Sequence, residues 1–137
     1  DWSLRNGRSG FYTLQAAIAA LHAQAPQYEQ TDWAQICGLY DLLLQAAPSP
    51  VIALNRAVAV AMRDGPDAGL ALINEIAIAG HLERYHLLHA ARADFYRRLG
   101  RGAEAMAAYE QALALTTQEP ERLFLQGRLT ELRAGVL

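Results

Sequence analysis

Two histidines, His86 and His89, lie three residues apart at the start of the stretch HLLHAARADFYRRLGRGAEAMAAYEQALAL. On a helix this spacing places both imidazoles on one face, where they could form part of a metal site. Such a site needs a further ligand within reach; His81 is nearby, whereas His22 is distant. In the alternative interpretation, His89 packs at a helix interface and His86 forms a hydrogen bond at the helix start. Because no paired-ligand signature accompanies the two histidines, we predict neither a metal site nor a cofactor.

Arginines are the second group that could bind a ligand, and four of them fall on predicted helices: Arg56, Arg92, Arg97 and Arg98. Guanidinium groups bind carboxylates through paired hydrogen bonds, so these side chains could hold an acidic peptide or the surface of another domain. Asn55, next to Arg56, could hydrogen-bond an extended peptide backbone. In the alternative interpretation, Arg97 and Arg98 form a solvated last turn of a helix, while Arg56 and Arg92 pair with carboxylates such as Asp94 or Glu83. Both interpretations remain open at the level of sequence.

The chemistry of catalysis is weakly represented in this chain. Cys37 is the one cysteine, so it cannot form an internal disulfide, and Ile36 and Tyr40 place it on the apolar side of a helix. We therefore predict a buried thiol and a reducing, cytoplasmic compartment. The sequence has no phosphate-binding glycine loop, no Ser–His–Asp order and no pair of carboxylates suited to acid–base work. We predict that this chain is not an enzyme.

The elements that must position these residues are helices. Hydrophobic residues make up 53% of the 137 residues and charged residues 19%, which argues against disorder. Alanine dominates the apolar residues and β-branched residues are sparse, which favours an all-α fold. Helical periodicity and end signals predict the following segments: Phe11–Ala25, Trp33 to just before Pro48, Val51–Arg63 after Ser49 and Pro50, Pro66 to about Ala79, Leu82–Leu99, Gly102–Thr116, and Pro120 onward with an apolar edge of Leu125, Leu129, Leu132 and Val136.

Small and aromatic residues at set positions indicate helical hairpins. Ala93 and Tyr96, followed by Ala105, Tyr109 and Ala112, match the spacing of a tetratricopeptide hairpin, in which small residues let two helices approach closely. A shift of 36 positions (93 minus 57) places Ala93 on Ala57 and preserves the alternation of small and large residues. We predict a right-handed α-solenoid of about three such hairpins plus a C-terminal capping helix. It would span residues 11–137, preceded by a linker at residues 1–10.

Charge and hydropathy exclude two classes of partner for this chain. The formal net charge is −2 and no basic run appears, so we predict no direct binding of nucleic acid. Residues 10–28 lack charges, but polar residues and Pro26 make them a poor membrane span. No signal peptide is visible. Because the chain begins with Asp1, we expect it to be a fragment of a longer protein.

Four stretches resemble a known family: YTLQAAIAALHAQAP, PSPVIALNRAVAVA, YHLLHAARADFYRRLGR and AYEQALALT. From Phe11 onward the chain is similar to the C-terminal tetratricopeptide-repeat domain of bacterial extracytoplasmic-function (ECF) sigma factors. The resemblance implies a parent protein that binds RNA polymerase core and directs it to promoters. This domain would be a regulatory docking module that contacts the polymerase core or the upstream sigma regions. It implies no catalytic residue, and the partner-binding candidates are Gln15, His22, Asn55, Arg56, His86, His89, Arg92 and Arg97.

Two alternatives to the sigma-factor interpretation stay open. The chain could be a stand-alone tetratricopeptide adaptor that binds a short peptide tail or a partner protein, with Asn55 and Arg56 at the binding surface. Less favoured is a metal-binding or enzymatic helical domain built on His86 and His89. The sequence does not determine the oligomeric state.

Overall fold

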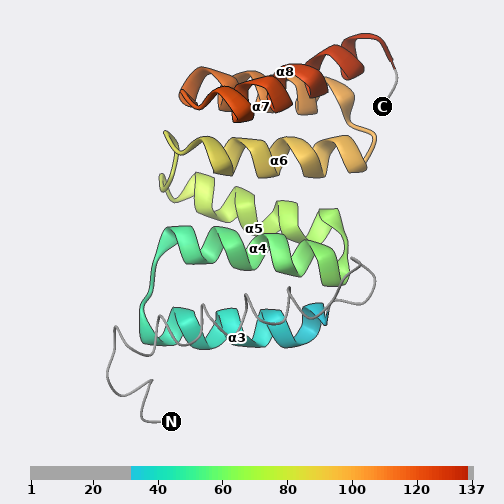
Figure 1. Cartoon of the computed structure of the whole chain (residues 1–137). Helices are drawn as coiled ribbons and strands as arrows, with labels where there is room; N and C mark the ends of the chain where they lie inside the picture. Colours follow the sequence, from blue (N-terminus) through green and yellow to red (C-terminus); the bar gives the residue numbers. More distant parts are fainter. Residues whose placement is uncertain (1–31, 136–137) are drawn as a thin grey trace. The chain divides into compact units, whose positions relative to one another are not determined.

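The computed structural model describes residues 32–135, and within that range every regular element is a helix (Figure 1). The helices are α3 (Trp33–Ala46), α4 (Pro50–Asp64), α5 (Pro66–Ile78), α6 (His86–Arg98), α7 (Gly102–Leu115) and α8 (Glu119–Arg133). The prediction of an all-α fold is confirmed for these residues. The predicted linker at residues 1–10 and the predicted helix Phe11–Ala25 lie outside the described range. The chain divides into two compact units, residues 1–65 and residues 66–137.

In the first unit, α3 and α4 pack against each other, and each begins at a recognisable signal. A side-chain oxygen of Asp32 accepts a hydrogen bond from the backbone N–H of Gln35 at 3.0 Å, which caps α3. Pro50 occupies the start of α4, where a missing N–H costs nothing. Ser49 precedes it as predicted, but its side chain makes no capping hydrogen bond. The buried side chains are aliphatic, alanine or thiol: Ile36, Cys37, Leu43, Ile52, Leu54, Ala57, Ala59, Val60 and Ala61.

The second unit contains α5 to α8, and its first connection differs from the prediction of a helix beginning at Leu82. The backbone is left-handed at Gly80 (φ 81°) and again at Leu82 (φ 62°), so no helix runs through these residues and α6 begins only at His86. Only the glycine tolerates that conformation without a steric penalty from Cβ. The connection therefore occupies residues that were predicted to form the first turn of a helix.

The α6–α7 hairpin turns at Gly100, which has φ 76°. The N–H of Arg101 donates to the carbonyl of Tyr96 at 2.9 Å, so the turn satisfies a carbonyl at the helix end. Helix α7 begins at Gly102, which is also the first residue of the predicted helix Gly102–Thr116. Leu99, the last residue of the predicted helix Leu82–Leu99, follows the end of α6 at Arg98 and is 38% exposed.

Alanines allow α6, α7 and α8 to pack closely around one aromatic ring. The buried cluster contains Ala93 of α6, Ala105, Ala108, Tyr109 and Ala112 of α7, and Leu125 and Leu129 of α8. Helices approach closely only where the facing side chains are small, and a buried ring fills the remaining volume. The predicted hairpin positions are therefore core positions, with Tyr96 at the margin of the cluster.

Helix α8 buries the predicted edge and is joined to α7 by a polar contact. Leu125 and Leu129 are each 3% exposed and Leu132 packs beside them, whereas Val136 lies outside the described residues. Nη1 of Arg122 donates to the carbonyls of Leu113 at 2.9 Å and Thr116 at 3.0 Å. These bonds satisfy carbonyls at the C-terminal end of α7 and hold α8 against it.

None of the helices described between residues 32 and 135 combines the length and the apolar character required to cross a membrane.

Candidate functional site

Among the candidates in the first unit, Arg56 forms an ion pair within that unit. Nε of Arg56 donates to Oδ1 of Asp41 at 2.6 Å, which links α4 to α3. Of the two interpretations of Arg56, the geometry therefore favours pairing with a carboxylate, although Asp41 is the partner and not Asp94 or Glu83. Asn55 lines a small hollow of about 160 Å³ together with Trp33, Tyr40, Val58 and Ala59. Gln15 and His22 lie outside the described residues.

Two of the arginines of α6, Arg97 and Arg98, pair with one carboxylate. Asp94 accepts from Nη2 of Arg97 at 2.5 Å and lies 2.9 Å from Nε of Arg98. Arg97 is therefore not part of a freely solvated turn, and its side chain is only 18% exposed. The predicted pairing of Arg92 with Asp94 or Glu83 is not among the ion pairs of the described residues, and Nε of Arg92 is buried without a hydrogen-bond partner. The arginines of α6 mainly stabilise their own helix.

The two histidines of α6 point to different partners. Nε2 of His89 donates to the backbone carbonyl of Glu83 at 2.8 Å, and the ring is 7% exposed. Nε2 of His86 instead lies 2.8 Å from Oε2 of Glu121 on α8. Among residues 32–135 there is no group of three or more His, Cys, Asp or Glu side chains that could hold a metal ion. The geometry matches the alternative for His89, which is buried and bonded within its unit, whereas Nε2 of His86 makes no hydrogen bond and lies against Glu121 instead.

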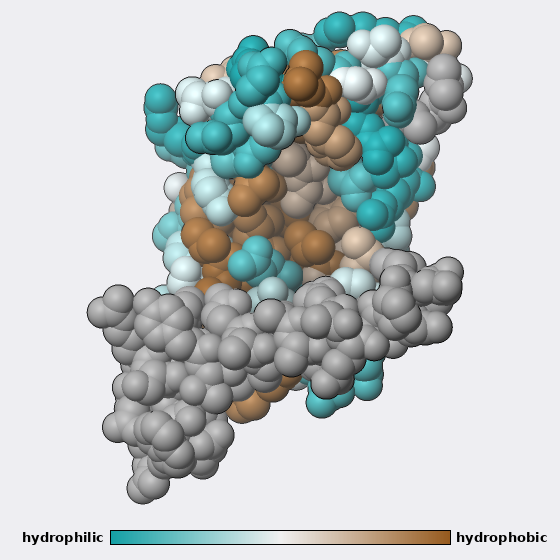
Figure 2. Space-filling model, in the orientation of Figure 1, coloured by the Kyte–Doolittle hydropathy of each residue, from teal (hydrophilic) through white to brown (hydrophobic). Residues whose placement is uncertain are grey.

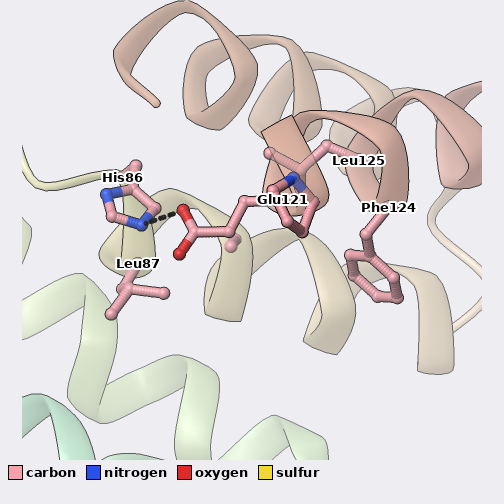
Figure 3. Close-up of a pocket in the computed structure, with 7 residues that line it drawn as sticks. His86, Leu87, Glu121, Phe124 and Leu125 are labelled. Atoms are coloured by element: carbon pink, nitrogen blue, oxygen red, sulfur yellow. Dashed lines mark ion pairs between the residues drawn. The ribbon is translucent and has the colours of Figure 1, made fainter. Parts of the chain in front are cut away.

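Glu121 connects three helix ends in the second unit (Figure 3). Its Oε2 accepts a hydrogen bond from Oγ1 of Thr116, at the end of α7, at 2.7 Å. The same oxygen faces His86 at the start of α6, but the approach is too oblique for a hydrogen bond, so the contact is electrostatic when the imidazole is protonated. Both contacts use one oxygen of a carboxylate that is 43% exposed. This cluster positions α8 against α6 and α7.

Beside this cluster, α6 and α8 form a hollow of about 310 Å³. It is lined by His86, Leu87, Ala90, Pro120, Glu121, Phe124 and Leu125. Figure 3 shows Phe124 and Leu125 on the α8 side and Leu87 on the α6 side. Phe124 is 58% exposed and Leu87 is 43% exposed, so two large apolar side chains at this hollow contact solvent. A hollow with apolar walls and one charged margin is suited to binding a bulky apolar group.

Around the hollow, the surface of α8 combines apolar and hydrophilic residues. Leu123 is 59% exposed next to Phe124, and Figure 2 shows a small apolar cluster within the mainly hydrophilic surface of α7 and α8. The guanidinium of Arg128 lies 5.2 Å from the centre of the Phe124 ring, and its Nη1 is 3.3 Å from Oε2 of Glu131. Nε of Arg128 is buried and has no hydrogen-bond partner.

A second, larger hollow of about 770 Å³ lies between α7 and α8 and has polar walls. Its lining residues are Glu110, Leu113, Ala114, Arg122, Gln126, Leu129, Thr130 and Arg133. The charged groups of this hollow already have intramolecular partners, because Arg133 lies 3.4 Å from Glu110 and Arg122 bonds to backbone carbonyls. These contacts hold α7 and α8 together, so the hollow is a weaker candidate for a binding site than the hollow between α6 and α8.

Cys37 is 1% exposed, as predicted for a buried thiol. Burial raises the pKa of the Cys37 thiol, and the positive charges of Arg63 and Arg56 oppose part of that rise. A raised pKa reduces the population of the nucleophilic thiolate at neutral pH. The structure supports a packing role for this residue.

Sequence reasoning missed the residues that form the hollow: Leu87, Glu121 and Phe124. Their contact depends on how α8 lies against α6, which no local pattern encodes. One signal was present, because Leu123 and Phe124 fall off the stripe formed by Leu125 and Leu129. Two large apolar residues outside the apolar face of a terminal helix indicate a surface with a partner.

Comparison with the curated proteins finds a relative of unknown function. No family model matches the sequence, and no solved structure matches it. "Uncharacterized protein R00370" of Rhizobium meliloti (strain 1021) is 44% identical to it over 134 residues. The match covers 98% of this chain and 31% of that protein, so the chain spans about a third of the length of the relative it matches.

Proposed function

We propose that this chain is the regulatory protein-interaction domain of an ECF-type sigma factor, folded as a right-handed solenoid of tetratricopeptide-like hairpins. The sigma-factor assignment depends on the resemblance of stretches such as PSPVIALNRAVAVA and YHLLHAARADFYRRLGR. The long relative is compatible with this assignment, because the matching region makes up 31% of it. The partners are RNA polymerase core, the upstream sigma regions, or both.

One observation supports binding more strongly than catalysis: the polar candidates are engaged in structural contacts, while large apolar side chains remain exposed. His89, Arg56 and Arg97 each bond within their own unit. Leu123 and Phe124, in contrast, are each more than half exposed. Exposed apolar residues clustered beside a hollow are typical of protein-interaction surfaces.

The test is reconstituted transcription with the parent sigma factor, with and without this domain. We expect deletion to change promoter-directed transcription while the remaining sigma regions still bind polymerase core. Unchanged transcription at every promoter tested would contradict a regulatory role. Retained core binding is the control, because it shows that the remaining protein is folded.

The adaptor alternative makes a different prediction. A tetratricopeptide adaptor would bind an extended peptide through Asn55, which lines the hollow beside Trp33 and Tyr40. Arg56 is held by Asp41 and would have to exchange that partner for a peptide carboxylate. Binding of a peptide that is lost in Asn55→Ala, with no effect of the domain on transcription, would favour the adaptor.

A further inference from the structure

The exposed surface of α8 carries both a protruding aromatic side chain and a hollow that could receive one. Phe124 is 58% exposed, and the hollow beside it has a volume of about 310 Å³ with walls that include Leu87, Ala90 and Leu125. A two-fold interface joins a surface patch to a copy of itself, so the patch must be complementary to itself. A projecting side chain next to an apolar hollow meets that requirement.

The charges on the same surface have the matching arrangement. Glu121, Phe124 and Arg128 follow each other at spacings of three and four residues, so they share one face of α8. In an antiparallel pair of α8 helices centred between Phe124 and Leu125, Glu121 of each copy faces Arg128 of the other, since 121 plus 128 equals 124 plus 125. Each Phe124 then faces Leu125, which lines the other copy's hollow. One register therefore pairs both the charges and the apolar groups.

The two charged groups retain capacity for a second partner. Glu121 meets His86 and Thr116 through Oε2, which leaves Oε1 for another contact. Nε of Arg128 is a buried donor without a hydrogen-bond partner, and its contact with Glu131 is long, at 3.3 Å. The 28% exposed guanidinium can accommodate a carboxylate of a second copy through its Nη groups, because its contact with Glu131 is long.

We propose that two copies of this chain associate through an antiparallel pair of α8 helices, with Phe124 of each copy in the hollow between α6 and α8 of the other. This proposal is independent of the sigma-factor assignment. The contact extends along one helix of 15 residues, about 22 Å long at 1.5 Å per residue. It is smaller than a standard interface of about 800 Å² per partner, so we expect a weak dimer with a dissociation constant of roughly 10⁻⁵ to 10⁻³ M.

Sedimentation equilibrium of the 137-residue chain, from about 10 µM to about 1 mM, tests the proposal directly. We expect a concentration-dependent rise from monomer toward dimer. Phe124→Asp should abolish that rise, and its helical circular dichroism should be unchanged because the side chain is exposed in the monomer. Gln126→Asp, at another exposed position of α8, is the matched control and should leave association intact. A monomer at every concentration would overturn the proposal.

Charge exchange tests the register. Arg128→Glu and Glu121→Arg should each weaken the dimer at least tenfold, because each single change creates two like-charged pairs across the two-fold axis. The double variant Glu121→Arg/Arg128→Glu restores opposite charges and should regain association. Failure of the double variant to regain it would overturn the antiparallel register. If the chain is monomeric but Phe124→Asp prevents capture by upstream sigma regions, the surface binds that partner and the second-copy proposal is wrong.

Discussion

The helix pairs α3–α4 and α6–α7 have loops of equal length but reach close packing by different means. Residues 47–49 join the first pair and residues 99–101 join the second. Proline ends one helix and starts the next in the first pair, whereas Gly100 supplies a left-handed turn in the second. Restricting φ and permitting positive φ are opposite solutions to the same problem of reversing a helix.

The interiors of these pairs also differ. Large aliphatic side chains such as Ile36, Leu43 and Ile52 are buried in the first unit. In the second unit, four alanines surround the ring of Tyr109, and α8 completes the cluster with two leucines. A core built around one large ring depends strongly on that ring, because the methyl groups of the neighbouring alanines are too short to move into a void.

The largest effect should therefore come from Tyr109→Ala, which removes a ring that is 1% exposed. We expect a loss of about 3–5 kcal/mol in the free energy of unfolding, measured by chemical denaturation. Tyr109→Phe is the matched control. The hydroxyl is buried beside the Arg97 guanidinium, so its removal should cost at most about 1.5 kcal/mol, well below the loss expected for Tyr109→Ala. Equal losses in the two variants would show that the hydroxyl, and not the ring, is the important group.

Charged contacts provide the next comparison between the units. Arg122→Ala leaves two carbonyls at the end of α7 without their charged donor, and we expect a cost of about 1.5–3 kcal/mol. In the first unit, Asp41→Asn removes an ion pair whose side chains are 30% and 53% exposed, so we expect at most about 1 kcal/mol. In chemical denaturation, raising the salt concentration should reduce the loss caused by Asp41→Asn more than the loss caused by Arg122→Ala. A larger cost for Asp41→Asn would contradict this ranking.

Glycine positions separate turn chemistry from helix propensity. Gly100→Ala forces a Cβ into a backbone with φ 76°, and we expect a loss of about 1 kcal/mol. Gly38 lies within α3, is exposed, and has open space where a Cβ would be built. Gly38→Ala should therefore stabilise the protein by about 0.5–1 kcal/mol. Thermal denaturation should show a lower melting temperature for Gly100→Ala and a higher one for Gly38→Ala. A shift in the same direction for both variants would contradict the interpretation.

The smallest effect at neutral pH concerns two tyrosines, one in each unit. Burial raises the pKa of both Tyr40 and Tyr109 above the ordinary tyrosine value, and for Tyr109 the Arg97 guanidinium opposes part of the rise. Because burial favours the neutral hydroxyl in the folded state, the contribution of each tyrosine to stability is fully present below the unfolded pKa of about 10. It is lost as pH rises through the higher pKa of the folded state. We expect the free energy of unfolding to fall with pH above about 10. Tyr109→Phe should fall less steeply than the unchanged protein in the same titration.

Much of the local structure could be predicted because its causes are local. Asp32 and Pro50 mark helix starts, Gly100 marks a helix end, and each functions there in the structure. The buried alanines and Tyr109 were also predictable, because a close helix contact requires small residues at regular spacing. Leu82 shows the limit of local reasoning, since its left-handed backbone has no glycine to signal it.

The candidate site was less predictable than the helices. The spacing of His86 and His89 was read correctly as one helical turn, yet it did not reveal that each ring has a separate partner. Arg56 pairs with Asp41, which lies 15 residues away on another helix. Such pairs depend on the rotation and separation of packed helices, which are properties of the assembled unit and not of a sequence window.

The amino-acid sequence by itself determined the all-α class, most helix limits and the small-residue contacts of the α6–α7 hairpin, because all of these follow from backbone sterics and periodicity. Only the tertiary structure decided that Glu121 meets Thr116 and His86, and that Phe124 remains exposed beside a hollow. The physical reason is that a side chain's partner is selected by the distance and orientation between elements. Those are settled when α8 packs onto α7 and brings its charged and aromatic residues to the start of α6.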